Sequence, residues 1–271
     1  MRILKNKIEL SGQGLHSGKI CNLKIEPCES DKIILNGLEI NKFELDGSSR
    51  GSDYILPDGS KIRTCEHVLS ALTGCGIWSK VKINVDGGEM PALDGCAAML
   101  SEEILKNSET VSAENKNKIL RISHPVIIRE NNKRFIAAFP IDENEEKLLI
   151  NYMVEYDYIG AQILDFEYSS ENYIKNISRA RTFAYERDIN YLRSHGMAMG
   201  GNLENAILIG EKNINASGGL RWPDEFVRHK ILDLIGDLTA VGVPIYAHII
   251  ALRAGHDLHL KLAKKIREEI I

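Results

Sequence analysis

The chain has 271 residues, of which 44% are hydrophobic and 27% are charged, and its formal net charge is −4 at pH 7. This composition is typical of a globular protein with a buried core. The weakly acidic balance offers no general attraction to nucleic acid or to an anionic membrane surface, so neither is expected as a partner.

The N-terminal sequence MRILKNKIELSGQG carries charges every few residues and contains no apolar signal-peptide region. No stretch approaches the roughly 20 apolar residues of a membrane span, so we expect a cytoplasmic protein without a membrane span, and a monomer. The odd number of cysteines and the lack of CxxC spacing predict free thiols rather than a cysteine metal site. The five cysteines are Cys21, Cys28, Cys65, Cys75 and Cys96.

Short runs that alternate apolar and polar residues and are rich in β-branched residues predict strands in both halves of the chain. In chain order they are 19–27, 80–87, 119–130, 133–140, 147–156 and 246–254. The polar, aperiodic segment 108–118 predicts a linker. It divides the chain into a first domain, 1–110, and a second domain, 119–271.

Each half also contains one conspicuous apolar helix. The first, TCEHVLSALTGCGI, begins with Thr64 as its expected N-cap. The second, WPDEFVRHKILDLIGDLTAVG, has Pro223 near its first turn, followed by acidic residues. His67 and His229 each precede a glycine by seven residues, and both helices lead into a strand, which favours a duplicated α+β unit.

A polar stripe interrupts the second helix. His229, Asp233 and Asp237 are spaced by four residues, so they share one helix face. Carboxylates on such an apolar helix are costly to bury unless they are paired or bound to metal. HxxxD places an imidazole and a carboxylate one turn apart, where both can bind one ion. The alternative is a buried His–Asp pair at a helix–helix contact.

The first helix offers further candidates in its first turn. His67 can complete a His₂Asp set with an open fourth position, the pattern of catalytic zinc. Glu66 points about 100° away and can act as general base toward a water at that position. The alternatives are a core histidine for His67 and, for Glu66, an acid favoured by the helix dipole.

His256 follows Gly255 directly after the last predicted strand. As an imidazolium it can stabilise an oxyanion or protonate a leaving amine. The dyad His256–Asp257 also allows a metal phosphohydrolase of the HD type. That class needs partner histidines on surrounding helices, and the chain is too rich in predicted strands to supply them.

Seven segments, in order, resemble one known family over nearly the whole chain. They are QGLHSG, TCEHVLSAL, MPALDG, SRARTFAYERDINYL, MGGNLENAI, DEFVRHKILDLIGDL and GHDLHLKL. The family is that of the UDP-3-O-acyl-N-acetylglucosamine deacetylases, zinc-dependent enzymes of lipid A biosynthesis. The resemblance implies an α+β fold of two related domains, each a β-sheet layered on helices, with the active site between them. It also implies two inserts, a compact one from 36–60 and one around 181–203 that forms a passage for the substrate's acyl chain.

The resemblance implies a role for each matching residue. His67, His229 and Asp233 match the ligands of Zn²⁺, which Fe²⁺ can replace in the cell, and Glu66 matches the general base. His256 matches the cationic partner of the leaving amine, with Asp237 orienting it and Thr182 polarising the acetyl carbonyl. The residues that match substrate contacts are Phe183, Lys230 and Arg253, with Asp94 as a supporting residue or, equally, a simple turn former before Gly95.

Three positions depart from the family pattern. Cys65 replaces a valine, Cys96 a serine and His259 an asparagine, and none of these changes removes a catalytic group. Two rival functions stay open: a non-catalytic nucleotide-sugar binding homologue, and a zinc deacetylase for another N-acetyl sugar. The expected reaction is hydrolysis of the N-acetyl group of UDP-3-O-acyl-N-acetylglucosamine to the free amine and acetate.

Overall fold

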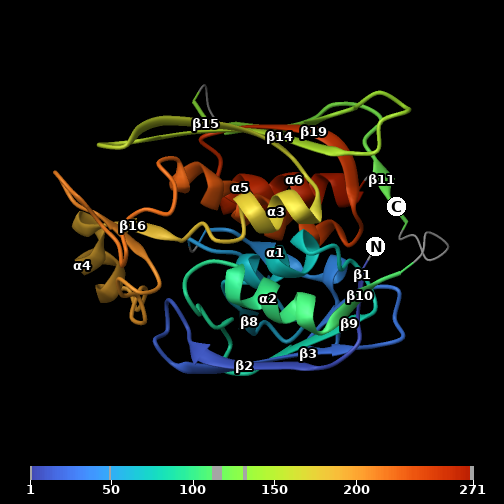
Figure 1. Ribbon diagram of the computed structural model, residues 1–271, viewed down its shortest axis with the longest axis horizontal. Helices are drawn as coiled ribbons and strands as arrows, with labels where there is room; N and C mark the ends of the chain where they lie inside the picture. The colour runs from blue at the N-terminus through green and yellow to red at the C-terminus, as the bar shows by residue number, and fades with distance from the viewer. Residues whose placement is uncertain (1, 49, 112–117, 131–132, 269–271) are drawn as a thin grey trace.

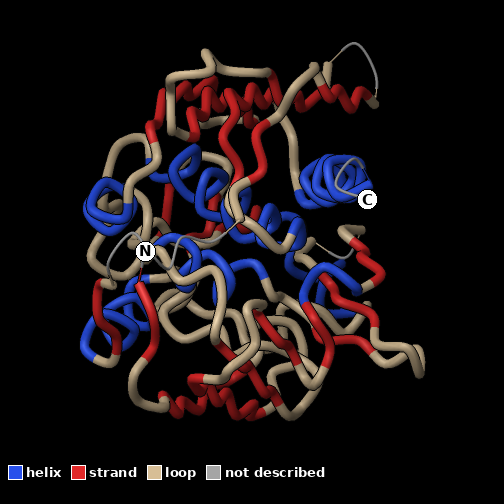
Figure 2. The backbone as a smooth tube through the Cα atoms, turned by 90° about the vertical axis from the view of Figure 1, so that its right-hand side faces the viewer, coloured by secondary structure: helices blue, strands red, loops and turns tan. Residues whose placement is uncertain are grey.

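The computed structural model describes residues 2–48, 50–111, 118–130 and 133–268. Two β-sheets form the outer layers of the molecule, and helices fill the space between them (Figure 1). Figure 2 shows the same layering from the side. Within the described ranges, no helix is long and apolar enough to cross a membrane.

The first sheet has five strands. In spatial order they are β2 (Ile8–Gln13), β3 (Ile20–Pro27), β9 (Val81–Val85), β4 (Ile33–Leu35) and β5 (Leu38–Glu39). Neighbouring strands are antiparallel except for β4 and β9, which are parallel.

The second sheet repeats this arrangement. Its main strands, in spatial order, are β12 (Val126–Arg129), β13 (Phe135–Phe139), β19 (Ile245–Leu252), β14 (Leu148–Tyr156) and β15 (Gly160–Glu167), and β11 (Leu120–Arg121) also pairs with β19. Here too one internal pair, β14 with β19, is parallel and the others on the main path are antiparallel. The matching orders and directions confirm the predicted duplication of an α+β unit.

The helices between the sheets also correspond. They are α1 (Glu66–Gly74) and α2 (Ala98–Lys106) in the first unit, and α3 (Ser170–Asn176), α5 (Glu225–Leu238) and α6 (His256–Glu268) in the second. In each unit a helix precedes the inner strand and another follows it. The helix α5 is buried along nearly its whole length, since it packs on α1 on one side and under the second sheet on the other.

The start of α1 differs from the prediction. Cys65, not Thr64, occupies the N-cap position, and no side chain caps the helix there. Thr64 has a left-handed backbone with a φ of 55°. Its hydroxyl lies 3.3 Å from Glu89 Oε1, which draws it away from the helix.

At Gly236 the backbone of α5 lies close against the backbone of α1. A Cβ atom at this position would lie 2.0 Å from the backbone oxygen of Glu66. Alanine normally favours a helix over glycine by about 1 kcal/mol, so a glycine in this buried helix indicates that the close backbone approach decides the residue.

Gly236→Ala is therefore expected to destabilise the fold, by about 1–3 kcal/mol as for other overpacked cores. The extra methyl group must push α5 away from Glu66. Urea unfolding followed by circular dichroism would measure the change. Gly201→Ala is the control, because a Cβ atom there meets no atom closer than 3.5 Å. An unchanged unfolding midpoint for Gly236→Ala would contradict the steric argument.

Each unit carries an insert that differs from the other. The first is a three-stranded sheet of β6 (Glu44–Asp46), β7 (Asp53–Ile55) and β8 (Lys61–Ile62). The second contains β16 (Phe183–Tyr185), α4 (Glu186–Ser194), β17 (Ile207–Ile209) and β18 (Ile214–Asn215). Both inserts differ from the predicted bounds of 36–60 and 181–203. The first begins later than predicted, because β5 belongs to the first main sheet, and the second extends past residue 203 to β18.

The predicted linker is partly wrong. Ser108–Thr110 forms β10, which pairs with β1 (Arg2–Leu4), so its backbone is held by strand hydrogen bonds despite its polar side chains. Residues 112–117 of that segment lie outside the described residues.

Candidate active site

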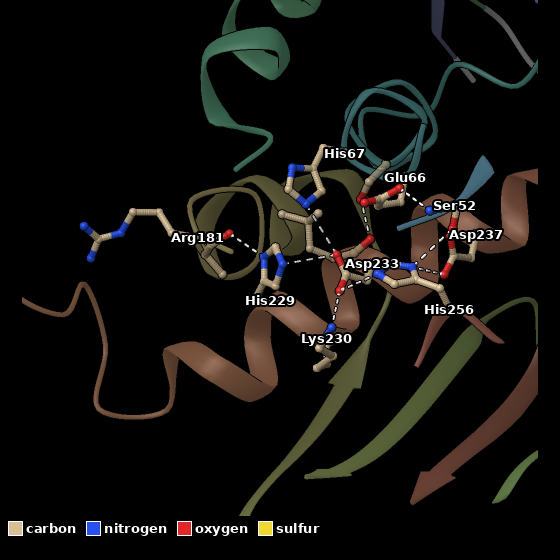
Figure 3. Close-up of polar contacts among 12 residues, drawn as sticks. Ser52, Glu66, His67, Arg181, His229, Lys230, Asp233, Asp237 and His256 are labelled. Atoms are coloured by element: carbon tan, nitrogen blue, oxygen red, sulfur yellow. Dashed lines mark hydrogen bonds and ion pairs between the residues drawn. The ribbon is translucent and has the colours of Figure 1, made fainter. Parts of the chain in front are cut away.

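The predicted ligand face of α5 meets the first turn of α1 in the middle of the molecule. Figure 3 shows His229 and Asp233 from α5 opposite His67 and Glu66 from α1. All four side chains are buried. The site is thus made by helices of both repeated units, as the α1–α5 packing requires.

Two imidazoles and one carboxylate converge at this point. His229 Nε2 lies 3.3 Å and His67 Nε2 lies 3.5 Å from Asp233 Oδ1. The three ligand atoms of His67, His229 and Asp233 all lie within 4.8 Å of one another. Two neutral imidazoles and a carboxylate are the donors that a divalent zinc or iron site uses.

Asp233 Oδ1 shows why a cation fits this cluster. It is fully buried, and within the described ranges it has no hydrogen-bond partner. Its fellow oxygen Oδ2 accepts a hydrogen bond from Lys230 Nζ at 2.7 Å. A buried carboxylate oxygen without a donor is costly, and a metal ion between Oδ1 and the two imidazoles removes that cost.

The far side of His229 is fixed by the backbone. Its Nδ1 lies 3.1 Å from the carbonyl oxygen of Ala180, which leaves Nε2 directed at the cluster. Burial lowers the pKa of His229 to about 3, despite the opposing charge of Asp233. A neutral ring with Nδ1 held by a carbonyl is the form in which histidine binds metals.

A buried ion pair holds the segment that carries Ala180. Arg181 is 1% exposed, and its Nε donates to Glu225 Oε1 at 2.9 Å. The guanidinium also donates to the carbonyl oxygens of Ser217 and Gly219. The ion pair therefore anchors Ala180 and Thr182, the residues on either side of Arg181.

Glu66 lies beside the cluster with its carboxylate turned away from His67. Its Oε2 accepts a hydrogen bond from the backbone N–H of Ser52 at 2.8 Å. Burial raises the pKa of Glu66, although His256 and His67 oppose the rise. A raised carboxyl pKa suits a group that must accept and release protons near neutral pH.

Asp237 lies behind His256. Asp237 Oδ2 is 2.9 Å from His256 Nδ1, so the ring's Nε2 faces the cluster, 3.5 Å from Asp233 Oδ2. Burial alone would lower the pKa of His256, but the carboxylates of Asp237, Asp233 and Glu66 outweigh it and raise the pKa to about 9. These carboxylates therefore favour the protonated, imidazolium form of the ring.

His259 shares the same carboxylate oxygen. Its Nδ1 lies 2.7 Å from Asp237 Oδ2, and its Nε2 lies 2.8 Å from the hydroxyl of Tyr152. The hydroxyl of Ser52 donates to the other oxygen, Asp237 Oδ1. The Asp237 carboxylate thus accepts hydrogen bonds from three side chains. These bonds hold it in the orientation in which it pairs with His256.

A cavity of about 470 Å³ opens over the cluster. It is large enough for a small-molecule ligand. The predicted site residues in its wall are Glu66, His67, Thr182, Phe183, His229, Lys230, Asp233, Arg253 and His256. Arg253 lies at its edge, paired with Glu155 at 3.0 Å and half exposed.

Asp94 does not line this cavity. Its Oδ2 lies 3.4 Å from Arg221 and 3.0 Å from the thiol of Cys96. Arg221 in turn donates from its backbone to Glu225. The structure therefore places Asp94 next to the ion pair that anchors Thr182, and not among the groups around the cluster.

A second, apolar cavity of about 380 Å³ adjoins the first. The two share the wall residues Leu15, Arg50, Thr182, Phe183 and Ala184. The remaining walls come mainly from the second insert, with Ile189, Leu192, Leu203 and Leu208 among them. The insert thus builds an apolar space that begins beside Thr182.

Sequence reasoning missed the contacts of Ser52, His259, Arg181 and Glu225. Arg181 lies inside the segment SRARTF and Glu225 at the start of α5, so their place in the motifs was a usable signal. His259 appeared only as a departure from the family pattern. Nothing in the local sequence around Ser52 indicates its contact with Asp237, which is 185 residues away.

Comparison with known proteins agrees with the family resemblance of the seven sequence segments. The family model described as UDP-3-O-acyl N-acetylglycosamine deacetylase matches residues 1–268. The UDP-3-O-acyl-N-acetylglucosamine deacetylase of Thermodesulfovibrio yellowstonii is 36% identical over 98% of this chain and 91% of its own length. Those of Oleidesulfovibrio alaskensis and Campylobacter jejuni are 37% and 36% identical, over 98% and 95% of this chain and 88% of each relative.

Proposed function

The chain belongs to the UDP-3-O-acyl-N-acetylglucosamine deacetylase family, and we propose that it hydrolyses the N-acetyl group of that sugar nucleotide in lipid A biosynthesis. The products are UDP-3-O-acyl-glucosamine and acetate. The observation that carries the proposal is the convergence of His67, His229 and Asp233 beside Glu66 and His256 at the base of one cavity.

His67, His229 and Asp233 would hold the metal, and Zn²⁺ is the proposed ion, with Fe²⁺ as the alternative in the cell. When bound, such an ion supplies a Lewis acid that acidifies water and polarises a carbonyl oxygen. The support is the donor set and the unpartnered Oδ1 of Asp233.

Glu66 and His256 are the proposed acid–base groups. The free oxygen of the Glu66 carboxylate takes the proton of the attacking water, while Ser52 holds the other oxygen. The new C–O bond forms at the acetyl carbonyl, and the developing oxyanion is stabilised by the His256 imidazolium and the Thr182 hydroxyl. When the C–N bond breaks, the amine takes a proton from His256 or Glu66.

The two cavities support the proposed substrate. Phe183 and Lys230 would contact the sugar and diphosphate, and the Arg253 guanidinium at the edge suits a diphosphate oxygen. The apolar cavity of the second insert would receive the 3-O-acyl chain, which buries apolar surface there. Asp94 is proposed to support the site indirectly, through Arg221.

We further propose residues 1–110 and 119–271 as the two domains, a cytoplasmic location and a monomeric state. The two sheets of matching topology support the division. The five free cysteines support a reducing compartment.

A deacetylation assay tests the proposal directly. Acetate release is measured with UDP-3-O-acyl-N-acetylglucosamine and with unacylated UDP-N-acetylglucosamine, before and after chelation of metal. We expect release from the acylated substrate alone and its loss on chelation. Equal turnover of both substrates would contradict the role of the apolar cavity, and no release from either would contradict the function.

Asp237→Asn tests the pairing with His256 by its pH profile. The Asp237 carboxylate raises the pKa of His256, so a neutral asparagine lowers that pKa. His256 then loses its proton at lower pH, and the alkaline limb of the activity profile moves to lower pH. Metal content measured by elemental analysis should stay unchanged. An alkaline limb that does not move would show that His256 does not depend on Asp237.

A further inference from the structure

Ser52 lies between the two acid–base groups of the site. It is completely buried and immediately precedes β7, between the first turn of α1 and the C-terminal end of α5. Figure 3 shows it between Glu66 and Asp237. Through Ser52 the first insert contacts both central helices.

Every polar group of Ser52 is used in this position. The backbone N–H donates to Glu66 Oε2 at 2.8 Å. The backbone carbonyl accepts from the N–H of Cys65, at the start of α1, at 3.0 Å. The hydroxyl donates to Asp237 Oδ1, since an ionised carboxylate can only accept.

The three contacts have different consequences. The N–H bond occupies one oxygen of Glu66, which leaves the other oxygen to meet a water molecule. The hydroxyl fixes the Asp237 oxygen that His256 does not use, and Ser52 Oγ is itself 3.2 Å from His256 Nδ1. One residue thus sets the position of Glu66 and the plane of the carboxylate that orients His256.

We propose that Ser52 is a positioning residue for the deacetylation. It fixes the positions of the Glu66 carboxylate and of the Asp237–His256 pair relative to each other. The proposal rests on the proposed function of the site. Ser52 reaches the reacting atoms only through these two groups, so its loss should affect turnover and leave the binding of substrate and metal intact.

The alternative is that Ser52 only ties α1 to α5. The chain offers a matched test of that alternative, because the buried hydroxyl of Ser70 on α1 donates to the carbonyl oxygen of Leu232 on α5 at 2.7 Å. Ser70→Ala removes a hydrogen bond between the same two helices without touching Glu66, Asp237 or His256. It is expected to lower the unfolding midpoint while kcat stays near that of the parent.

Ser52→Ala removes the hydroxyl and keeps both backbone contacts. We expect kcat on UDP-3-O-acyl-N-acetylglucosamine to fall about 10-fold, the size seen when an outer contact to a catalytic group is lost. KM and bound zinc should stay at parental values. An unchanged kcat, or a loss confined to KM or to zinc content, would overturn the proposal.

A double-mutant cycle tests whether the effect passes through Asp237. If Ser52 acts on that carboxylate, Ser52→Ala should slow the Asp237→Asn enzyme by much less than it slows the parent. Rate losses that multiply in the double variant would show that the hydroxyl acts by another route, and would overturn the proposed link.

A second pair of variants serves if Ser52→Ala does not fold. Ser52→Thr keeps the hydroxyl, and Ser52→Val has the same shape without it. The threonine variant is expected to turn over about 10-fold faster than the valine variant, and equal rates would overturn the proposal. Each variant is compared with the parent enzyme in the same assay. An inactive parent would refute the proposed function of the site. A Ser52 variant as active as an active parent would refute only the role of Ser52.

Discussion

His229→Ala is expected to leave the protein with almost no bound zinc and no measurable deacetylase activity. The substitution removes one of the three donors and exposes no replacement, because Ala180, Asp233 and His67 surround the vacated ring. Loss of an outer contact to a ligand already costs about 10–100-fold in affinity or activity, so loss of the ligand itself should cost more. His67→Ala and Asp233→Ala should behave in the same way.

Elemental analysis after dialysis against metal-poor buffer measures the zinc content of each variant. His248→Ala is the control, since His248 lies on β19 and contacts Asn151 of the second sheet instead of the cluster. It should keep the parental zinc content and activity. Full zinc in all three ligand variants would remove the basis for the site.

The helices of the site could be predicted because their signal is local. His229, Asp233 and Asp237 repeat every four residues, and this spacing alone places them on one face of α5. All three are buried there, as the apolar neighbours indicate. The strand runs were equally clear, since β14 and β19 alternate between buried and half-buried residues along their length.

The rest of the site depends on contacts that no local pattern encodes. Ser52 meets Asp237, and His259 meets Tyr152, only because the packing of the helices between the two sheets brings distant segments together. The same holds for β10, where polar side chains predicted a linker. Its strand structure comes from backbone pairing with β1, and backbone hydrogen bonding is insensitive to side-chain polarity.

Thr64 illustrates a different limit. Threonine before an apolar helix is a good N-cap by preference, and the preference was outweighed by tertiary structure. Glu89 accepts hydrogen bonds from the backbone of His16 and Ser17 and lies close enough to Thr64 to contact its hydroxyl. The local signal was correct about the helix and wrong by one residue about where it starts.

Glu66→Gln is expected to keep its zinc and to lose about 100-fold or more in kcat, within the range for removal of a general base. Glutamine has nearly the same shape, and its amide oxygen can still accept from the backbone N–H of Ser52. What it cannot do is take a proton from water. The ligands on α1 and α5 are untouched, so elemental analysis should find parental zinc.

The pH profile separates this loss from a general disturbance of the site. Glu66 must be ionised to act, and burial raises its pKa, so the acidic limb of the parent should lie above the range of an ordinary carboxyl group. In Glu66→Gln that limb should disappear from the residual activity, because the group that titrates is gone. Glu89→Gln, a buried glutamate that does not line the catalytic cavity, should retain the limb and a near-parental rate. Near-normal turnover by Glu66→Gln, or an acidic limb that survives the substitution, would assign the proton transfer to another residue.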